Sequence, residues 1–379
     1  MYILGPTFRA GSTMSFKIIL DNMIERGLHI IIIINDKNKN IDFINYGHSK
    51  KCVIEELNLE MSILPKPKNI NDYIKLPYRL IKKLYHLYKS KKNVEKIICK
   101  YKPDIVHTNV GVYHQAYKFC YNNNIPHIWH LREYQTKGLD WIILPSKRMF
   151  EKRLQKSNVI TVSEDIKKHF NLTKHGKSIS LWNGILSKKE HIYIHEKEPY
   201  FLFATRISKQ KNIELLINAF DNISDKLQKY KIIIAGAAED EMYLENLKQW
   251  IDSLNCKDRI QFLNYRDDIT ELMKKATALI VSSNYEGLGR MTLEATFMGC
   301  LVIGRNNGGT KEILSKTNNG ILFNTVSELS ESMIYVDSIV KTNEYKKRIL
   351  TAQNIIIDKC CNENYTETIY SYYKSILNN

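Results

Sequence analysis

The sequence lacks the patterns that mark disulfide-bonded and metal-bound proteins. Its seven cysteines include one adjacent pair but no Cys-x-x-Cys spacing, so we expect reduced thiols and neither a zinc site nor a disulfide framework. Asp-x-Asp, which would hold a divalent metal at a bound phosphate, is also missing from the 379 residues. We therefore expect no metal and no other cofactor.

Long apolar runs are also missing. The longest, residues 30–34, is far too short to cross a bilayer, and the N-terminus has no basic segment followed by an apolar one. The absence of Gly-x-Gly-x-x-Gly weakens a dinucleotide-binding interpretation. We expect a cytoplasmic protein, soluble or peripherally bound at the inner face of the cell membrane.

The chain has enough length and apolar content for two domains. It is 44% hydrophobic, and in both halves short apolar runs alternate with segments of helical spacing. This alternation predicts an α/β protein with two Rossmann-like parallel-sheet domains that face each other across a cleft. The expected strands are residues 1–4, 28–34, 105–107, 125–129, 159–162, 200–204, 231–236, 259–263, 278–282, 301–304 and 321–323.

Two glutamates eight positions apart, in the segment EGLGRMTLE, are the most informative feature. Residues 277–283 suit a buried strand and residues 291–299 a helix, which places Glu286 in the loop at the strand's carboxyl end and Glu294 in the first turns of the helix. Ligands of open α/β sheets bind at that edge. The intervening loop offers backbone N–H groups to a phosphate and comprises Gly287, Leu288, Gly289, Arg290 and Met291.

A carboxylate accepts hydrogen bonds from two neighbouring hydroxyls, so we expect Glu294 to hold a ribose and Glu286 a hexose. Taken alone, such a pair is more often two solvated side chains. The following segment favours the functional interpretation, because residues 301–312 repeat the order of strand, glycine loop, helix and carboxylate.

With these motifs, nearly the whole chain resembles the retaining glycosyltransferases of the GT-B fold, specifically glycosyltransferase family 4 (glycosyl transferases group 1). The resemblance implies that Arg206 and Lys211, after a strand, clamp the donor diphosphate, and fixed cations would stabilise the leaving group. Thr205 and Asn212 stand where the family more often has glycine, and neither change removes a charge.

The resemblance also implies the domain boundaries. Asn183 and Gly184 match the family's Asn-Gly at the hinge. We therefore expect an acceptor-binding domain over residues 1–183, a nucleotide-sugar-binding domain over residues 184–362, and a last helix, 363–379, that crosses back to the first domain.

Residues of the acceptor side are less clearly marked. Gly11 and Ser12 open a helix after the first strand and are expected to meet the donor phosphate. His130 ends an expected strand, and the resemblance implies that it contacts the donor sugar near the reacting carbon, although a lone histidine is as often structural. Arg132 and Glu133 are weaker acceptor candidates. The donor's base is expected near Leu263 and Tyr265.

The net positive charge of the chain lies in its first half. Residues 1–182 carry 31 Lys and Arg against 15 Asp and Glu, whereas residues 183–379 carry 25 of each. Residues 66–102 hold twelve basic and two acidic residues. Such a basic amphipathic helix can lie on an anionic membrane surface, or it can simply be a solvated face. Its helically spaced leucines and interleaved tyrosines are Leu76, Leu80, Leu84, Leu87, Tyr73, Tyr78, Tyr85 and Tyr88.

The expected function is transfer of a hexose, with retention, from a UDP- or GDP-sugar to the hydroxyl of a glycan or lipid-linked acceptor in surface-polysaccharide assembly. A GT-B protein that binds nucleotide sugar without turnover, and a nucleotide-sugar 2-epimerase, remain alternatives. Nucleic acid is not an expected partner, because the usual binding modules are missing and the carboxylates would repel a phosphate backbone.

Overall fold

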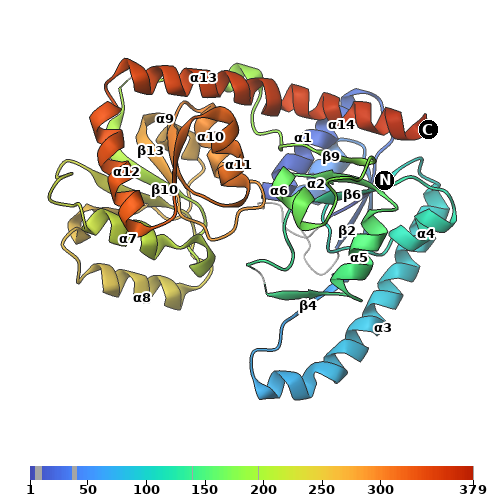
Figure 1. The fold of residues 1–379 in the computed structure, drawn as a ribbon. Helices are drawn as coiled ribbons and strands as arrows, with labels where there is room; N and C mark the ends of the chain where they lie inside the picture. Colours follow the sequence, from blue (N-terminus) through green and yellow to red (C-terminus); the bar gives the residue numbers. More distant parts are fainter. Residues whose placement is uncertain (5–10, 36–40, 139, 195, 379) are drawn as a thin grey trace. The chain divides into compact units, whose positions relative to one another are not determined.

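The computed structural model describes residues 1–4, 11–35, 41–138, 140–194 and 196–378. The chain separates into two compact units, one formed by residues 1–184 with 365–379 and the other by residues 185–364. Each unit is a parallel sheet with helices packed against it (Figure 1). The predicted fold class, α/β with two parallel-sheet domains, is confirmed.

The sheet of the first unit has seven parallel strands in the order β3-β2-β1-β5-β6-β8-β9. Sequence reasoning missed β3 and β9, since β3 is an edge strand without a buried residue and β9 has three residues. The strands are β1 (Tyr2–Ile3), β2 (Ile31–Asn35), β3 (Val53–Leu57), β5 (Val106–Thr108), β6 (His127–Leu131), β8 (Asn158–Thr161) and β9 (Ser178–Ser180).

The last helix of the chain belongs to the core of the first unit. Tyr365, Ile369 and Tyr373 of this helix are buried in one cluster with Tyr2 of β1 and Phe16. An antiparallel pair, β4 (Ile63–Pro65) with β7 (Trp141–Ile143), lies outside the main sheet. The helices are α1 (Gly11–Glu25), α2 (Ile41–Ser49), α3 (Ile70–Tyr101), α4 (Tyr117–Asn122), α5 (Lys147–Leu154), α6 (Glu164–His169) and α14 (Asn362–Leu377).

Helix α3 is anchored at one end only. Its buried residues, Ser90, Val94 and Ile98, all lie in the second half, and its first half extends beyond the sheet (Figure 1). The side chain of Asn69 caps its N-terminus by accepting from the Asp72 N–H at 2.9 Å. Among the described residues, no helix combines the length and the apolar character that a bilayer crossing requires.

The sheet of the second unit has six parallel strands in the order β12-β11-β10-β13-β14-β15. Its strands are β10 (Glu198–Ala204), β11 (Lys231–Ala235), β12 (Ile260–Phe262), β13 (Ala276–Val281), β14 (Leu301–Arg305) and β15 (Gly320–Phe323). Its helices are α7 (Ile213–Asp221), α8 (Glu241–Ile251), α9 (Ile269–Lys275), α10 (Arg290–Phe297), α11 (Gly308–Thr317), α12 (Val326–Ile339) and α13 (Asn343–Cys360).

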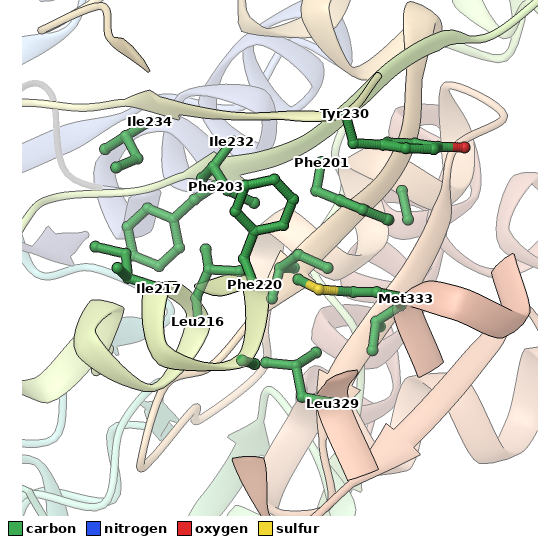
Figure 2. Packing of buried hydrophobic residues seen from close by; sticks show 14 of the residues in the cluster. Phe201, Phe203, Leu216, Ile217, Phe220, Tyr230, Ile232, Ile234, Leu329 and Met333 are labelled. Carbon is green, nitrogen blue, oxygen red and sulfur yellow. The ribbon is translucent and has the colours of Figure 1, made fainter. Parts of the chain in front are cut away.

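The core of the second unit fixes strand β10. Phe201 and Phe203 of this strand pack with Phe220 of α7, and all three are almost fully buried (Figure 2). Ile232 of β11 and Met333 of α12 complete the same cluster. The loop that leaves the carboxyl end of β10 therefore starts from a rigid point.

Each sheet reverses its strand order at one place, between β1 and β5 in the first unit and between β10 and β13 in the second. Ligands of doubly wound folds bind outside the carboxyl ends of the strands at such a switch point. In the second unit this place is formed by the loops that carry Arg206 and Lys211 after β10 and Glu286 after β13.

Truncating the core beside β10 tests this packing. Phe220→Ala is expected to lower the free energy of unfolding of the second unit by roughly 3–5 kcal/mol, because a fully buried ring leaves a cavity. Chemical denaturation of the full chain would measure it. Met242→Ala, at a side chain that is 67% exposed on α8, should stay within about 0.5 kcal/mol. Equal effects of the two changes would contradict the assigned core.

Candidate functional site

An ion pair joins the two switch-point loops of the second unit. Lys211 Nζ donates to Glu286 Oε1 at 2.5 Å, and the two side chains are only 17% and 19% exposed. Lys211 ends a short 3₁₀ turn (Lys209–Lys211), and its carbonyl accepts from the Ser282 hydroxyl at 2.8 Å. The structure therefore brings together two of the four charged residues on which the sequence interpretation depends.

Asn284, which sequence reasoning missed, holds these loops in register. Its N–H donates to the Gln210 carbonyl at 3.0 Å, and its side-chain oxygen accepts from Arg305 Nη1 at 2.7 Å. Its own carbonyl accepts from Asn307 Nδ2 at 2.7 Å. Their positions in the sequence could have indicated this contact. Asn284, Arg305 and Asn307 end or follow neighbouring parallel strands, at the carboxyl ends of those strands.

Two glycines let the loops after β13 and β14 touch. Gly289 has φ +83° and precedes α10, and the N–H of Gly309 donates to the Glu286 carbonyl at 2.8 Å. A Cβ at Gly309 would lie 2.0 Å from the Leu288 carbonyl oxygen, so only glycine fits. Among the described residues no side chain caps α10, whose first turn contains Arg290 and Met291, the residues that the sequence predicts to bind phosphate. Gly287 lies in the same loop.

Glu294 lies on α10 and is 8% exposed. Its carboxylate accepts from Arg290 Nε, one helical turn earlier. The predicted position on a helix after the glycine loop is therefore correct, and the same carboxylate also neutralises an arginine at the start of that helix.

The position of Arg206 differs from the expectation that it lies beside Lys211 as a cationic pair. Its side chain is 70% exposed and pairs with Glu239, in the loop after β11. The backbone directs it there, because the N–H of Ile207 donates to the Ala237 carbonyl at 2.9 Å. The structure therefore places Lys211 against Glu286, and Arg206 beside a different carboxylate of the same unit.

The loop after β12 is tied to its neighbours by backbone groups. The N–H of Leu263 donates to the Ile234 carbonyl at 2.8 Å, and the Asn264 carbonyl accepts from the Gly236 N–H at 2.7 Å. Those two backbone groups are thus bonded within the unit, and the expectation that the base binds near Leu263 and Tyr265 stays a prediction. The ring of Tyr265 is 51% exposed, and its hydroxyl donates to Asp267 at 2.7 Å.

In the first unit, Arg132 acts as an internal clamp. Its guanidinium donates to the Asn109 side chain at 2.8 Å and to the Asn183 side chain at 2.8 Å. Asn109 follows β5, and Asn183 lies in the segment that the sequence predicts as a hinge. The arginine predicted to bind acceptor therefore joins two loops of its own unit.

His130 lies within β6 and is fully buried, whereas the sequence placed it at the strand's tip. Its Nδ1 is 3.3 Å from His107 Nε2 and 3.4 Å from Arg132 Nη2. Burial and the nearby guanidinium hold the pKa of His130 well below its usual range, so the ring is neutral. Among the described residues its Nε2 has no hydrogen-bond partner.

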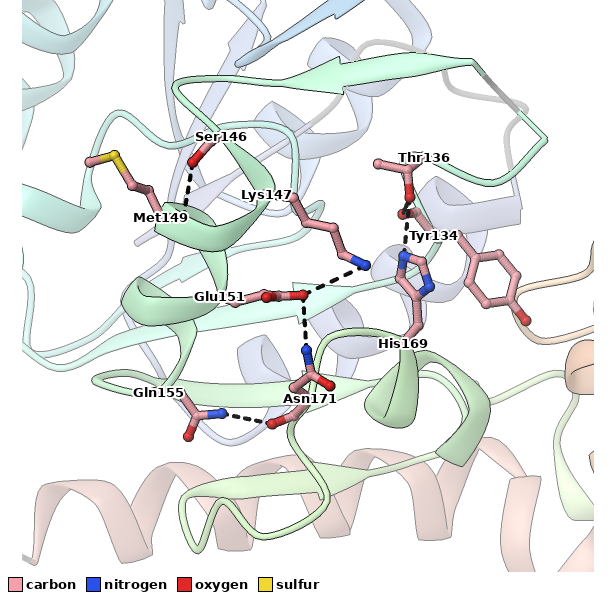
Figure 3. Close-up of polar contacts among 9 residues, drawn as sticks. All are labelled: Tyr134, Thr136, Ser146, Lys147, Met149, Glu151, Gln155, His169 and Asn171. Atoms are coloured by element: carbon pink, nitrogen blue, oxygen red, sulfur yellow. Dashed lines mark hydrogen bonds and ion pairs between the residues drawn. The ribbon is translucent and has the colours of Figure 1, made fainter.

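The loop after β6 is fixed against α6. The hydroxyl of Tyr134 donates to Asp165 at 2.5 Å. Thr136 Oγ1 lies 3.2 Å from His169 Nε2 (Figure 3). Within this loop, burial raises the pKa of Glu133. Gly11 and Ser12 form the start of α1, and the residues just before them lie outside the described part of the chain.

A pocket of about 870 Å³ lies at the opposite edge of the first unit's sheet. It is lined by His127, Asn158 and Lys177, which begin or immediately precede β6, β8 and β9. These are the amino ends of the strands, whereas the predicted site residues lie toward the carboxyl ends. We assign this pocket no part in donor binding.

Part of the second unit matches a known family. The model of the family "Glycosyl transferases group 1" matches residues 186–352, which are less than half of the 379-residue chain. Lys211, Glu286 and Glu294 all lie within the matched residues.

Relatives and solved structures support the same fold over the whole chain. An uncharacterized glycosyltransferase of Methanocaldococcus jannaschii, MJ1607, is 31% identical over 43% of this chain and 46% of that protein, so the match spans about half the relative. A glycosyltransferase structure from Rickettsia africae superposes with a TM-score of 0.79 at 18% identity, covering 100% and 98% of the two chains. Anabaena HepE in complex with UDP-glucose superposes with a TM-score of 0.71 at 16% identity, covering 99% and 100%. The two units have the GT-B fold.

A double-mutant cycle in the second unit tests the ion pair. Lys211→Met and Glu286→Gln should each lower the free energy of unfolding by roughly 1–3 kcal/mol, because each leaves a half-buried charge unpaired. The double variant should lose less than their sum, with a coupling of about 0.5–3 kcal/mol.

The matched control is Lys275 with Glu198, 3.3 Å apart and both more than half exposed. Its coupling should be under about 0.5 kcal/mol. A coupling for Lys211 and Glu286 no larger than the control's would show that the pair is not formed in solution.

Proposed function

We propose that the chain is a retaining glycosyltransferase that moves a hexose from a UDP- or GDP-sugar to an acceptor hydroxyl. The observation that carries the proposal is the Lys211–Glu286 pair, at the switch point of a domain that matches glycosyl transferases group 1. In the structure these side chains neutralise each other. A sugar diphosphate offers both of them a substitute partner, phosphate oxygens for the ammonium and sugar hydroxyls for the carboxylate.

The proposed roles are those that the sequence predicts, and the positions of the loops support them. Lys211 and the first N–H groups of α10 bind the diphosphate and stabilise the charge that develops on it. Arg206, exposed on a long side chain one loop away, supplies the second cation. Glu286 orients the sugar, and Glu294 receives the ribose hydroxyls. Tyr265 and the loop that contains it border the base.

The reaction needs no enzyme nucleophile. The bond from the anomeric carbon to the phosphate oxygen breaks while the acceptor oxygen bonds to the same face of the sugar. The acceptor's proton passes to the departing phosphate oxygen, so atoms and charge balance without a covalent enzyme intermediate. Charge stabilisation by Lys211 and Arg206 replaces a metal ion in this scheme, and HepE with UDP-glucose supports a uridine donor.

Turnover should depend on Glu286. Glu286→Ala is expected to lower kcat about 100-fold, since a hydrogen bond to a charged group contributes roughly 1.5–3 kcal/mol and orientation adds to it. Glu198→Ala, at an exposed carboxylate of the same unit, should leave kcat unchanged. The assay measures transfer or donor hydrolysis with UDP- and GDP-hexoses, and EDTA should not lower the rate. Full activity of Glu286→Ala would remove this residue from the mechanism.

A lipid-linked acceptor, and a position at the inner face of the cell membrane, are the second part of the proposal. Helix α3 has an exposed apolar stripe at spacings of three and four residues. Apart from Leu84 it consists of Ile and Tyr side chains, whereas the other predicted leucines, Leu76, Leu80 and Leu87, are half-buried. The stripe residues are 48% or more exposed and comprise Ile70, Tyr73, Ile74, Tyr78, Ile81, Leu84, Tyr85 and Tyr88.

Exposed lysines accompany this stripe. Lys75, Lys82 and Lys89 recur every seven residues, so they lie on one face of α3 next to the apolar side chains. Lys83 instead pairs with Glu60 at 2.5 Å, which makes it part of the unit's own structure. An apolar stripe beside a row of cations suits the interface of an anionic bilayer.

Vesicle flotation tests the membrane proposal. Replacing Lys75, Lys82 and Lys89 by Gln should weaken binding to vesicles of anionic and neutral phospholipid at least about tenfold, because each cation contributes about 1 kcal/mol near the surface. The charge-matched control replaces the exposed Lys226, Lys229 and Lys257 of the second unit by Gln and should bind as the unmodified protein does. Equal binding by all three proteins would refute docking through α3.

A further inference from the structure

The pocket at the amino ends of β6, β8 and β9 lies entirely within the first unit. Its volume of about 870 Å³ is in the range of sites that hold small molecules. Residues of α4, of the three strand starts and of α14 line it. The hydroxyl of Tyr372, on α14, donates to the Lys177 carbonyl at 2.7 Å, so the last helix is fixed against the segment that precedes β9. Segments that are far apart in the sequence therefore hold the walls of this pocket in place.

The charged residues that line the pocket are both cations. They are Lys156 and Lys177, and no aspartate or glutamate of the described residues lines it. Neither lysine forms an ion pair within the ranges that the structure describes, and Lys156 Nζ lies 5.5 Å from the centre of the Tyr121 ring. Two ammonium groups without a carboxylate beside them favour an anionic ligand, above all a phosphate group.

The rest of the wall suits a ring that carries hydroxyl groups. Tyr117 and Tyr121 stack with their ring centroids 5.9 Å apart and give the pocket an aromatic side. Asn124 and Asn158 also line it, and a side-chain amide both donates and accepts hydrogen bonds. A sugar ring has C–H groups for the tyrosines and hydroxyls for the asparagines.

His127 adds a buried polar side chain to this wall. It is 6% exposed, its Nε2 lies 2.9 Å from Thr108 Oγ1, and its Nδ1 has no hydrogen-bond partner among the described residues. Burial lowers the pKa of His127 to about 3, so the ring is neutral and adds no charge to the pocket. A buried polar atom without a partner costs stability, and a ligand hydroxyl at this wall would give it one.

We infer that this pocket is a binding site for a hexose phosphate, with the phosphate on Lys156 and Lys177 and the sugar ring against Tyr117 and Tyr121. The inference goes beyond the proposed transfer reaction, because every residue of the pocket belongs to the first unit and the residues proposed to hold the donor's diphosphate and sugar belong to the second. The pocket therefore gives the chain a second place for a phosphorylated sugar, one that needs no nucleotide.

Calorimetric titration of the full chain with glucose 6-phosphate tests the site. Lys156→Gln with Lys177→Gln should weaken binding at least about tenfold, because the phosphate loses both of its cations. The matched control is Lys75→Gln with Lys82→Gln, which removes the same charge from exposed positions on α3 of the same unit. The control should bind glucose 6-phosphate as the unmodified protein does.

Two further titrations identify the ligand and the place where it binds. Inorganic phosphate and glucose should each bind at least about tenfold more weakly than glucose 6-phosphate, because each reaches only part of the pocket. Lys211→Met, in the second unit, should bind glucose 6-phosphate as the unmodified protein does.

Four results would overturn the inference. They are no binding of glucose 6-phosphate by the unmodified protein, equal binding by the Lys156 and Lys177 variant, inorganic phosphate that binds as tightly as the ester, and weaker binding by Lys211→Met. The first three would leave only a cationic surface, and the last would place the ester in the donor site. None of the four bears on hexose transfer, which the activity assay of Glu286→Ala tests separately.

Discussion

The ion pair between Lys211 and Glu286 forms because β10 and β13 are neighbours in one parallel sheet, although 75 positions separate the two residues in the sequence. Parallel strands deliver their following loops to the same edge, and the strand order reverses there, so nothing from the sheet itself fills the space between the loops. The bond from Gly309 to the Glu286 carbonyl and the bonds around Asn284 then fix the loops. Only with these hydrogen bonds can the opposite charges of Lys211 and Glu286 lie close together in a half-buried place.

The first unit uses charge differently. Arg132 donates hydrogen bonds to the side chains of Asn109 and Asn183, and its Nη2 lies 3.4 Å from Nδ1 of the buried His130. Its charge also contributes to the low pKa of His107 and His130, which keeps both rings neutral.

Sequence reasoning located the strands of both sheets where apolar runs are long, as in β10, β11 and β14, because a strand buried on both faces has a continuous apolar sequence. It missed β3, which has no buried residue, and the three-residue strands β4, β7 and β9. The loop from Glu286 to Glu294 could be predicted from the sequence, because its glycines and carboxylates follow a strand and precede or begin a helix.

The contacts that the charged residues make could not be predicted from the sequence. Nothing in the chain near Arg206 indicates Glu239, since that contact depends on how the loops after β10 and β11 lie side by side. The exposed stripe of α3 likewise depended on which face packs onto the unit, and the leucine spacing alone suggested the wrong one. The contact of Tyr373 with His107 carried no signal in the sequence, because it forms only when α14 packs beside β1 and β5.

The most direct test of the central claim is a crystal structure of the chain with a bound UDP- or GDP-hexose. The account predicts that the Lys211–Glu286 bond is replaced, with Lys211 Nζ within hydrogen-bond distance of the diphosphate and Glu286 accepting from sugar hydroxyls. A donor bound elsewhere, with the ion pair intact, would contradict it.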